Sequence, residues 1–375
     1  MSAAAKIPVS VITGFLGSGK TTLLGKLLRH PGMNRVAVII NEFGEQSIDH
    51  DLVQTSSEQM VVLDNGCLCC RVRGDLQETL VDLWMKRRNG ETIDFNRVVI
   101  ETTGLADPAP VIHTMITDTS VCNTYALDAV ITLVDAVNGN EQLDTLEEPV
   151  KQAAIADRLV ITKTDLASPE EVELLEARLR ELNPHAAIVR CVMGDLDPSF
   201  LVDVGVRNAR ASEAAIERWL GSQAFVPIEA AGSGSVAPGA PGFALRPDKP
   251  RPRGQHTAGV DSFCLYYDKS FTWKTFSIAM EVLTSLRGPD LLRVKGLVDI
   301  EGERGPVVVQ GVQHLFHPPV TLYAWPSDDH RSRLVFITRN IPRALIENLL
   351  RAIFATAPVA PLPTPEAVPA VANGP

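Results

Sequence analysis

The chain has 375 residues, which is long enough for two domains with hydrophobic cores of their own. Hydrophobic residues make up 45% and charged residues 21%, ordinary proportions for a soluble globular protein. The formal net charge of -10 and the lack of a basic stripe exclude nucleic acid as a main partner. No segment approaches the roughly 20 apolar residues of a membrane span, and no signal-peptide core follows Met1. We therefore expect a cytoplasmic protein that does not bind membranes.

Short apolar, β-branched runs alternate with helical patterns through the first domain-sized part of the chain. The predicted strands are 9–13, 35–40, 60–63, 97–101, 129–135, 159–162 and 187–190. The predicted helices are 21–29, 76–88, a segment near 108–115, 147–156 and 169–182, the last opening with Ser168 as its N-cap. Most strands are apolar throughout rather than alternating, as in parallel sheets covered on both faces. The pattern predicts an α/β domain with a doubly wound, mainly parallel sheet.

Composition divides the chain further. Residues 221–259 are rich in Gly, Pro and Ala and are predicted to be a flexible linker after the α/β domain of residues 1–220. Residues 260–355 are predicted to form a smaller α+β domain, with a strand at 333–338 and helices at 276–287 and 343–354. The Ala/Pro-rich residues 356–375 are predicted to be a disordered tail.

A glycine-rich sequence, GFLGSGKT, follows the first strand and fits the pattern G-x-x-x-x-G-K-[ST] between a strand and a helix. Such glycines let backbone N–H groups approach phosphate oxygens, while the lysine neutralises phosphate charge and the hydroxyl ligates Mg²⁺. The nucleotide-binding residues predicted here are Gly14, Gly17, Ser18, Gly19, Lys20, Thr21 and Thr22.

A second phosphate-sensing segment is predicted at Glu101-Thr-Thr-Gly104. Most P-loop proteins end this strand with an aspartate that holds the magnesium shell, and Glu101 occupies that place here. Gly104 can offer its N–H to the γ-phosphate. We predict that Lys20, Thr21, Glu101 and Gly104 carry the catalysis and that Thr21 and Glu101 hold Mg²⁺.

The sequence Thr162-Lys163-Thr164-Asp165 follows a predicted strand and resembles the guanine motif N-K-x-D. Asp165 would accept from the two adjacent donors of guanine, which adenine lacks, and Lys163 would lie over the base. Thr162 replaces the asparagine, so we expect the loss of an amide that braces this loop. A helix N-cap is the alternative interpretation of the aspartate.

Three cysteines, Cys67, Cys69 and Cys70, crowd into the sequence NGCLCC, which we expect to be a short loop. Thiolates are soft ligands suited to Zn²⁺, Cu⁺ or Co²⁺. A fourth ligand could come from Glu42 or His50. A purely structural or incidental cysteine cluster is the alternative.

Together these segments resemble the CobW-type family of metal-trafficking GTPases. The resemblance is carried by GFLGSGKTTLL, NEFGEQSIDHDLV, NGCLCC, ETTGLADP, IADRLVITKTDL, LLRVKGLVDIEGERGPVVVQGVQHLFHPP and RSRLVFITR. It implies a P-loop GTPase domain followed by a CobW-like C-terminal domain, with GTP and Mg²⁺ as ligands. It also implies delivery of a metal, usually Zn²⁺, to a client apoprotein, with the cysteines as the carrier site and Glu42 in the first switch. Family members often carry a His-x-His pair where only His256 remains, so the metal, Zn²⁺ or Co²⁺, and the role of His256 stay open.

Other functions stay open beside this one. The same broad family serves cobalamin synthesis and nitrile hydratase maturation, so the resemblance does not name the client. A P-loop kinase or ATPase, and a GTP-gated scaffold with structural cysteines, are the rival hypotheses. Leu105, not a glutamine, follows Gly104, so the residue that orients the attacking water is unidentified. The sequence also leaves open whether the chain forms a homodimer.

Overall fold

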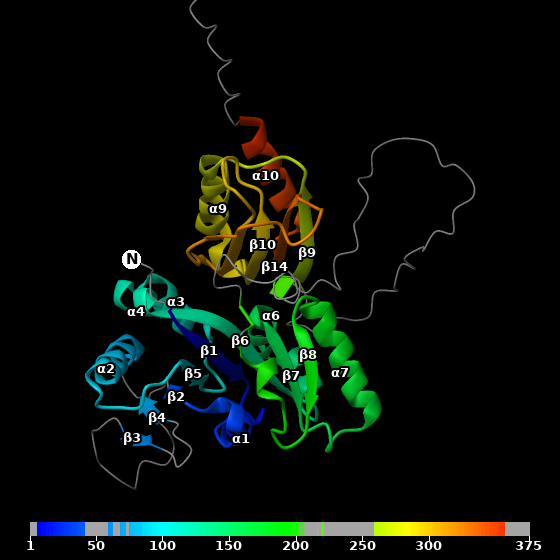
Figure 1. Ribbon diagram of the computed structural model, residues 1–375. Helices are drawn as coiled ribbons and strands as arrows, with labels where there is room; N and C mark the ends of the chain where they lie inside the picture. The colour runs from blue at the N-terminus through cyan, green and yellow to red at the C-terminus, as the bar shows by residue number, and fades with distance from the viewer. Residues whose placement is uncertain are drawn as a thin grey trace, which may run out of the picture.

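The computed structural model describes residues 6–41, 59–62, 68–72, 75–202, 204–205, 216, 219–220 and 259–356. They form two sheets with their own helices, and the smaller unit lies above the larger one in Figure 1. Residues 221–258 of the predicted linker and the tail beyond Thr356 lie outside the described residues. No helix in the described part of the chain is long and apolar enough to cross a membrane.

The larger sheet has eight described strands, and only β3 runs antiparallel to its neighbour. In spatial order they are β3 (Gln59–Val62), β4 (Leu68–Val72), β2 (Val36–Asn41), β5 (Arg97–Thr102), β1 (Ile7–Gly14), β6 (Tyr125–Asp135), β7 (Arg158–Thr162) and β8 (Ala187–Cys191). The predicted doubly wound, mainly parallel sheet is confirmed. The strand β4 was not predicted: it contains Cys69 and Cys70 and pairs with β2, where a loop was expected.

Helices cover both faces of this sheet. They are α1 (Lys20–Leu27), α2 (Leu76–Asn89), α3 (Ala109–Thr117), α4 (Thr119–Thr124), α5 (Gly139–Thr145), α6 (Glu147–Ile155) and α7 (Pro169–Leu182), with 3-10 turns at Pro31–Met33 and Pro198–Phe200. In β1, Val9 and Val11 join one buried cluster, whereas Ile12 joins a second cluster with Leu23 of α1. Burial on both sides explains why the strand is mostly apolar. Short α4 and α5 were not predicted.

The smaller sheet is antiparallel, in the order β12-β11-β10-β14-β9, and β13 also pairs with β11. Its strands are β9 (Val260–Tyr267), β10 (Arg293–Val298), β11 (Val307–Val312), β12 (Leu315–Phe316), β13 (Val320–Thr321) and β14 (Ser332–Arg339). Its helices are α9 (Trp273–Arg287) and α10 (Arg343–Thr356), with a 3-10 turn at Gly288–Asp290. Phe276 of α9 and Ile346 of α10 pack with Phe336 in one core, so both helices lie on one sheet face.

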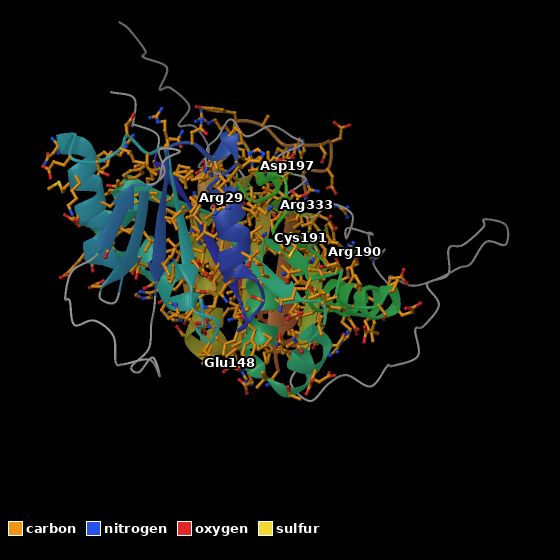
Figure 2. All side chains as sticks on the ribbon, turned by 90° about the horizontal axis from the view of Figure 1, so that it is seen from below. Arg29, Glu148, Arg190, Cys191, Asp197 and Arg333 are labelled. Atoms are coloured by element: carbon orange, nitrogen blue, oxygen red, sulfur yellow. The ribbon has the colours of Figure 1, made fainter. Side chains whose placement is uncertain are left out.

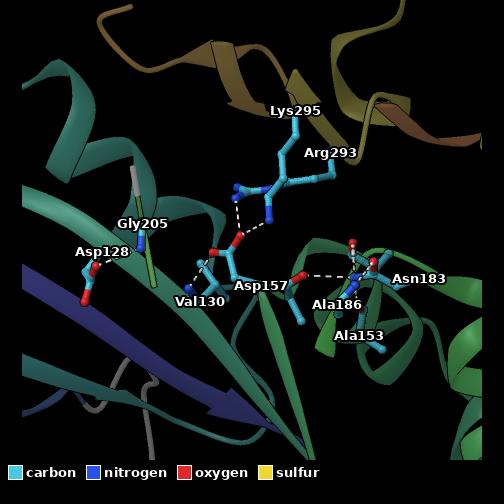
Figure 3. A network of polar contacts seen from close by, with 11 residues as sticks. Asp128, Val130, Ala153, Asp157, Asn183, Ala186, Gly205, Arg293 and Lys295 are labelled. Carbon is cyan, nitrogen blue, oxygen red and sulfur yellow. Dashed lines mark hydrogen bonds and ion pairs between the residues drawn. The ribbon is translucent and has the colours of Figure 1, made fainter. Parts of the chain in front are cut away.

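The opposite face of the smaller sheet meets the larger unit through a buried ion cluster (Figure 3). Asp157, directly before β7, accepts a hydrogen bond at 2.7 Å from Arg293 and pairs with Lys295, both on β10. The Val130 N–H donates to the second carboxylate oxygen of Asp157 at 2.8 Å. Asp157 lies at the amino end of β7, so this contact is at the sheet edge opposite the carboxyl ends of the strands, where α1 begins.

Two cations share one carboxylate in this cluster. Burial opposes ionisation of Asp157, but Arg293 and Lys295 outweigh it and hold the pKa of this carboxyl far below its usual range. Burial lowers the pKa of Lys295 to about 8, although Asp157 acts in the opposite direction. Trp219 lies with its ring 5.5 Å from the Lys295 ammonium, and Lys295 is 4% exposed. The contact between the two units is therefore fixed by charges that have little access to water.

Candidate functional site

The glycine-rich loop after β1 has a backbone that only glycine tolerates well. Gly17 and Gly19 have φ angles of 74° and 89°, in the left-handed region. A Cβ on Gly14 would meet the Leu133 carbonyl oxygen at 2.4 Å, whereas one on Gly17 would meet nothing within 4 Å. The loop thus packs tightly against β6 on one side and is open on the other. Backbone N–H groups on the open side are available to phosphate.

Lys20, the first residue of α1, is held inside this loop. Its Nζ donates to the Gly14 carbonyl at 2.8 Å and to the Phe15 carbonyl at 3.1 Å, and the residue is 9% exposed. Burial lowers the pKa of Lys20, and the nearby Glu101 carboxylate partly offsets this effect. A poorly solvated ammonium surrounded by carbonyl dipoles is ready to exchange them for phosphate oxygens.

The two predicted magnesium ligands meet. Thr21 Oγ1 donates to Glu101 Oε1 at 3.0 Å, because β5 pairs with β1 in a register that sets Glu101 beside Ile12. Oxygens at adjacent corners of an Mg²⁺ octahedron are about 3 Å apart, since each lies about 2.1 Å from the metal. The hydroxyl and carboxylate thus already have the spacing of two neighbouring ligands. Thr22, next on α1, is exposed.

Gly104 lies directly against the glycine-rich loop. A Cβ at this position would meet the Leu16 backbone nitrogen at 2.6 Å, so the two phosphate-sensing segments are in contact. Gln152 of α6 is buried and donates to the carbonyls of Gly104 and Ala106 at 3.3 and 3.1 Å. This glutamine positions the second segment from behind. The sequence analysis missed it because a single glutamine in a helical pattern carries no motif.

The predicted base-binding segment follows β7. The Thr162 hydroxyl donates to the Ser18 carbonyl of the glycine-rich loop at 2.8 Å and approaches the Val134 carbonyl at 3.3 Å. Threonine lacks the amide of the motif, but its hydroxyl braces the phosphate-binding loop in another way. Ser18 also contributes a buried side-chain hydroxyl beside Gly14.

Lys163 is held by Asp135, the last residue of β6, with Nζ donating at 2.7 Å. Burial opposes ionisation of Asp135, but hydrogen bonds from Lys163, Asn138 and the Val137 N–H outweigh it and lower the pKa. Asp165, two residues after Lys163, is exposed. Asp135 thus orients the Lys163 side chain, while the Asp165 carboxylate stays available to a base. Asp135 was not predicted as a site residue.

A second unpredicted element is the turn after β8. Gly194, with φ of 74°, packs on α1, where an added Cβ would meet the Leu23 Cα at 3.0 Å. Met193, with φ of 50°, is 67% exposed at the tip of this turn. Figure 2 views the molecule from below and labels Cys191, the last residue of β8, which is buried against α1. The turn therefore packs on α1, the helix that begins at the phosphate-binding loop.

The predicted metal ligands are only partly within the described residues. Cys69 and Cys70 lie in β4, whereas Cys67, Glu42, His50 and His256 lie outside the described part. The strand register sets Cys70 beside Ile39 of β2, and Ile39 beside Ile100 of β5. The cysteine strand is therefore two strands from the strand that carries Glu101. Among residues with described side chains, no group of three or more His, Cys, Asp or Glu could hold a metal.

The brace from Thr162 gives a testable prediction. Thr162→Val keeps the side-chain shape but leaves the buried Ser18 carbonyl without this donor, which should cost about 1–3 kcal/mol in the free energy of unfolding. Nucleotide affinity should fall as well, because the loop that binds phosphate loses its support. Thermal denaturation and nucleotide titration measure the two effects, with Thr164→Val as control. Equal behaviour of both variants would show that the Thr162 brace is unimportant.

Comparisons with known proteins agree with this geometry. Residues 8–190 match the model of the CobW/HypB/UreG nucleotide-binding domain, and residues 260–354 match the cobalamin synthesis protein cobW C-terminal domain. The zinc chaperone YjiA of Escherichia coli is 35% identical over 349 residues, covering 93% of this chain and 98% of the relative. The zinc-regulated GTPase metalloprotein activator 1 of Saccharomyces cerevisiae is 29% identical, covering 92% and 83%.

Among solved structures, Zn(II)-bound YjiA GTPase from Escherichia coli has a TM-score of 0.64 at 34% sequence identity, covering 93% of this chain and 98% of that one. A Zn(II)-bound triple mutant of the same protein has a TM-score of 0.65. The two domain models lie in the same order along the chain as the two sheets of the structure. Similarity of this extent, together with the geometry of the glycine-rich loop, shows that the chain belongs to the CobW family of P-loop nucleotide-binding proteins.

Proposed function

We propose that this chain is a GTP-hydrolysing metallochaperone that binds Zn²⁺ and transfers it to a client apoprotein. The observation that carries the proposal is the strand register: β4, with Cys69 and Cys70, is hydrogen-bonded to β2, and β2 to β5, which ends beside Glu101. Neighbouring strands are about 4.8 Å apart, so the cysteine strand lies about 10 Å from the strand carrying the magnesium ligand. The similarity to a zinc chaperone along 98% of its length supports zinc as the cargo.

The residues around the nucleotide have separable tasks in this proposal. Lys20 would exchange the Gly14 and Phe15 carbonyls for phosphate oxygens, bringing its charge to the bond that breaks. Thr21 and Glu101 would hold Mg²⁺, whose role is to neutralise developing phosphate charge. Asp165 would select guanine. Leu105 is 59% exposed where other GTPases carry the water-orienting glutamine, so we expect slow turnover until a partner completes the site.

Coupling between nucleotide and metal would travel along the sheet. Asn41 ends β2, directly before the predicted first switch and Glu42, and it pairs in register with Thr102 of β5 and Val72 of β4. A rearrangement of the first switch on hydrolysis would therefore act on the strand adjacent to the cysteines. An ordered switch in the GTP state would hold Glu42 near the thiolates and tighten the grip on metal.

The proposal predicts different zinc affinities in the two nucleotide states. Zn²⁺ should bind about 5–150-fold more tightly with a non-hydrolysable GTP analogue than with GDP, the range of a useful coupling free energy. A competition titration against a chromogenic chelator, at saturating Mg²⁺, measures both affinities, and Co²⁺ can be run alongside to compare the metals. Replacement of Cys67, Cys69 and Cys70 by serine is the control and should remove tight zinc binding while sparing nucleotide binding.

Each outcome distinguishes this function from its rivals. Equal zinc affinities with both nucleotides would leave a GTPase whose cycle does not drive metal delivery. Unchanged zinc binding in the triple serine variant would favour a scaffold with its metal elsewhere. Equal competition by ATP and GTP in the unmodified protein would favour a P-loop kinase or ATPase.

A further inference from the structure

The turn between β11 and β12 brings a histidine of the smaller unit next to a histidine of the larger one. His314 lies in this turn, and β12 lies against α3, which carries His113. The two ring centroids are 6.2 Å apart, with an angle of 52° between the ring planes. We propose that His113 and His314 form a second metal site, which binds a divalent ion such as Zn²⁺ and joins the two units.

The separation of the rings suits one shared ion. Two imidazoles bound to one tetrahedral Zn²⁺ have centroids about 5 Å apart, because each Zn–N distance is about 2.1 Å. The rings need to approach by about 1 Å, and both side chains are exposed and free to make that adjustment. Open coordination positions would be filled by water. The resulting site is separate from the cysteine strand and does not depend on the proposed metal transfer.

The hydrogen bonding of His113 prepares it for metal. The Thr117 hydroxyl donates its single proton to the His113 carbonyl at 3.0 Å. In the tautomer that carries its proton on Nδ1, His113 donates to Thr117 Oγ1 across the contact of 3.3 Å, and the lone pair lies on Nε2. Metal-binding histidines commonly donate their other ring N–H to such a partner, which fixes tautomer and ring orientation.

The backbone at His314 is held in place from two sides. The neighbouring Gln313 has a φ of 54° and donates to Asp107 Oδ2 at 3.4 Å, just before α3 begins. A Cβ on Gly288 would meet the His314 Cβ at 2.8 Å, so the 3-10 turn after α9 packs directly on this histidine. The backbone that carries His314 is thus fixed against the helix that carries His113.

The location of the proposed histidine site determines what a bound ion would do to the two units. The helix α3 follows the segment Glu101–Gly104, which contacts the phosphate-binding loop. A metal bridge would therefore tie the smaller unit to the helix that directly follows this segment. An ion that binds only the docked arrangement stabilises that arrangement by mass action. Zinc at this site would therefore hold the two units together.

The experiment measures Zn²⁺ affinity in the full chain with Cys67, Cys69 and Cys70 replaced by serine, so that thiolates do not compete for metal. Replacing even a hydrogen-bond partner of a metal ligand commonly costs 10–100-fold in affinity, so His113→Ala or His314→Ala should each weaken the site by about 10-fold or more. The double variant should bind zinc no more tightly than either single one, because both ligands serve one ion. Zinc should raise the unfolding temperature of the parent but not of these variants.

His330→Ala is the matched control, since this exposed histidine of the same unit stacks on Trp325, 5.0 Å away, rather than on another histidine. It should leave zinc affinity unchanged. Parent-like affinity in either His113→Ala or His314→Ala would overturn the shared site. Because the cysteines are absent, neither result depends on whether they carry metal.

Discussion

Replacing Lys20 with alanine should reduce GTP hydrolysis by about 100-fold or more, the usual cost of removing one electrostatic contact to a transition state. Its ammonium is the buried cation of the phosphate-binding loop, held within 3.1 Å of two carbonyl oxygens that phosphate would replace. Burial already lowers its pKa, so the charge is poorly solvated and acts strongly on the phosphate it contacts. Steady-state phosphate release at saturating GTP measures the loss.

Lys26→Ala is the matched control for this variant. Lys26 lies on the same helix, is exposed, and is near its carboxyl end. Its replacement should leave turnover unchanged, and both variants should keep the circular dichroism spectrum of the parent. Parent-like turnover in Lys20→Ala would remove the assignment of the glycine-rich loop as the catalytic phosphate site.

Local sequence patterns predicted the larger sheet well because its strands are buried on both faces. Val9 and Val11 on one side and Ile12 on the other make this run mostly apolar, as expected for a strand of a parallel sheet covered on both faces. The N-cap predicted at Ser168 was equally local, and the structure confirms it as part of a capping box with Glu171. By contrast, β4 was not predicted, because the cysteine cluster that includes Cys69 and Cys70 was interpreted as a metal-binding loop. Its backbone forms a regular ladder with β2.

The site residues that escaped prediction act across long separations in the chain. Thr162 reaches Ser18 over 144 positions, and Gln152 reaches Gly104 over 48. A threonine where the motif has asparagine signals a loss, and only the packing of β7 beside the phosphate-binding loop shows the compensating contact. Hydrogen bonds between distant segments leave no periodic trace in a single sequence.

The ion cluster between the two units is also a contact between segments far apart in the chain that was not predicted, since Asp157 and Arg293 are 136 positions apart. Breaking a buried ion pair by removing one partner commonly costs 3–5 kcal/mol, because the remaining charge is buried without compensation. Asp157→Asn should cost about that much in the free energy of unfolding, since it leaves Arg293 and Lys295 facing each other with no anion. The amide keeps the size of the carboxyl, so packing is preserved. Chemical denaturation of the full chain measures the loss.

The loss should also depend on pH. Lys295 has a folded pKa of about 8, below its ordinary 10.5, so between these values the unfolded chain binds more protons and stability rises with pH. Removing the Asp157 carboxylate removes a charge that raises this pKa, so in Asp157→Asn the rise begins below pH 8. The difference from the parent should then be largest near pH 6 and smaller near pH 9.

Asp144→Asn is the matched control, because Asp144 pairs with Arg178 while 46% exposed, and exposed pairs contribute only about 0–1 kcal/mol. Its effect should be small and independent of pH between 6 and 9. If Asp157→Asn behaved in the same way, water would be reaching the cluster and screening its charges. A large, pH-dependent loss would instead mean that Arg293 and Lys295 of β10 are shielded from water where they contact Asp157. Asp157 directly precedes β7, and the other end of this strand carries Thr162 and the base-binding segment.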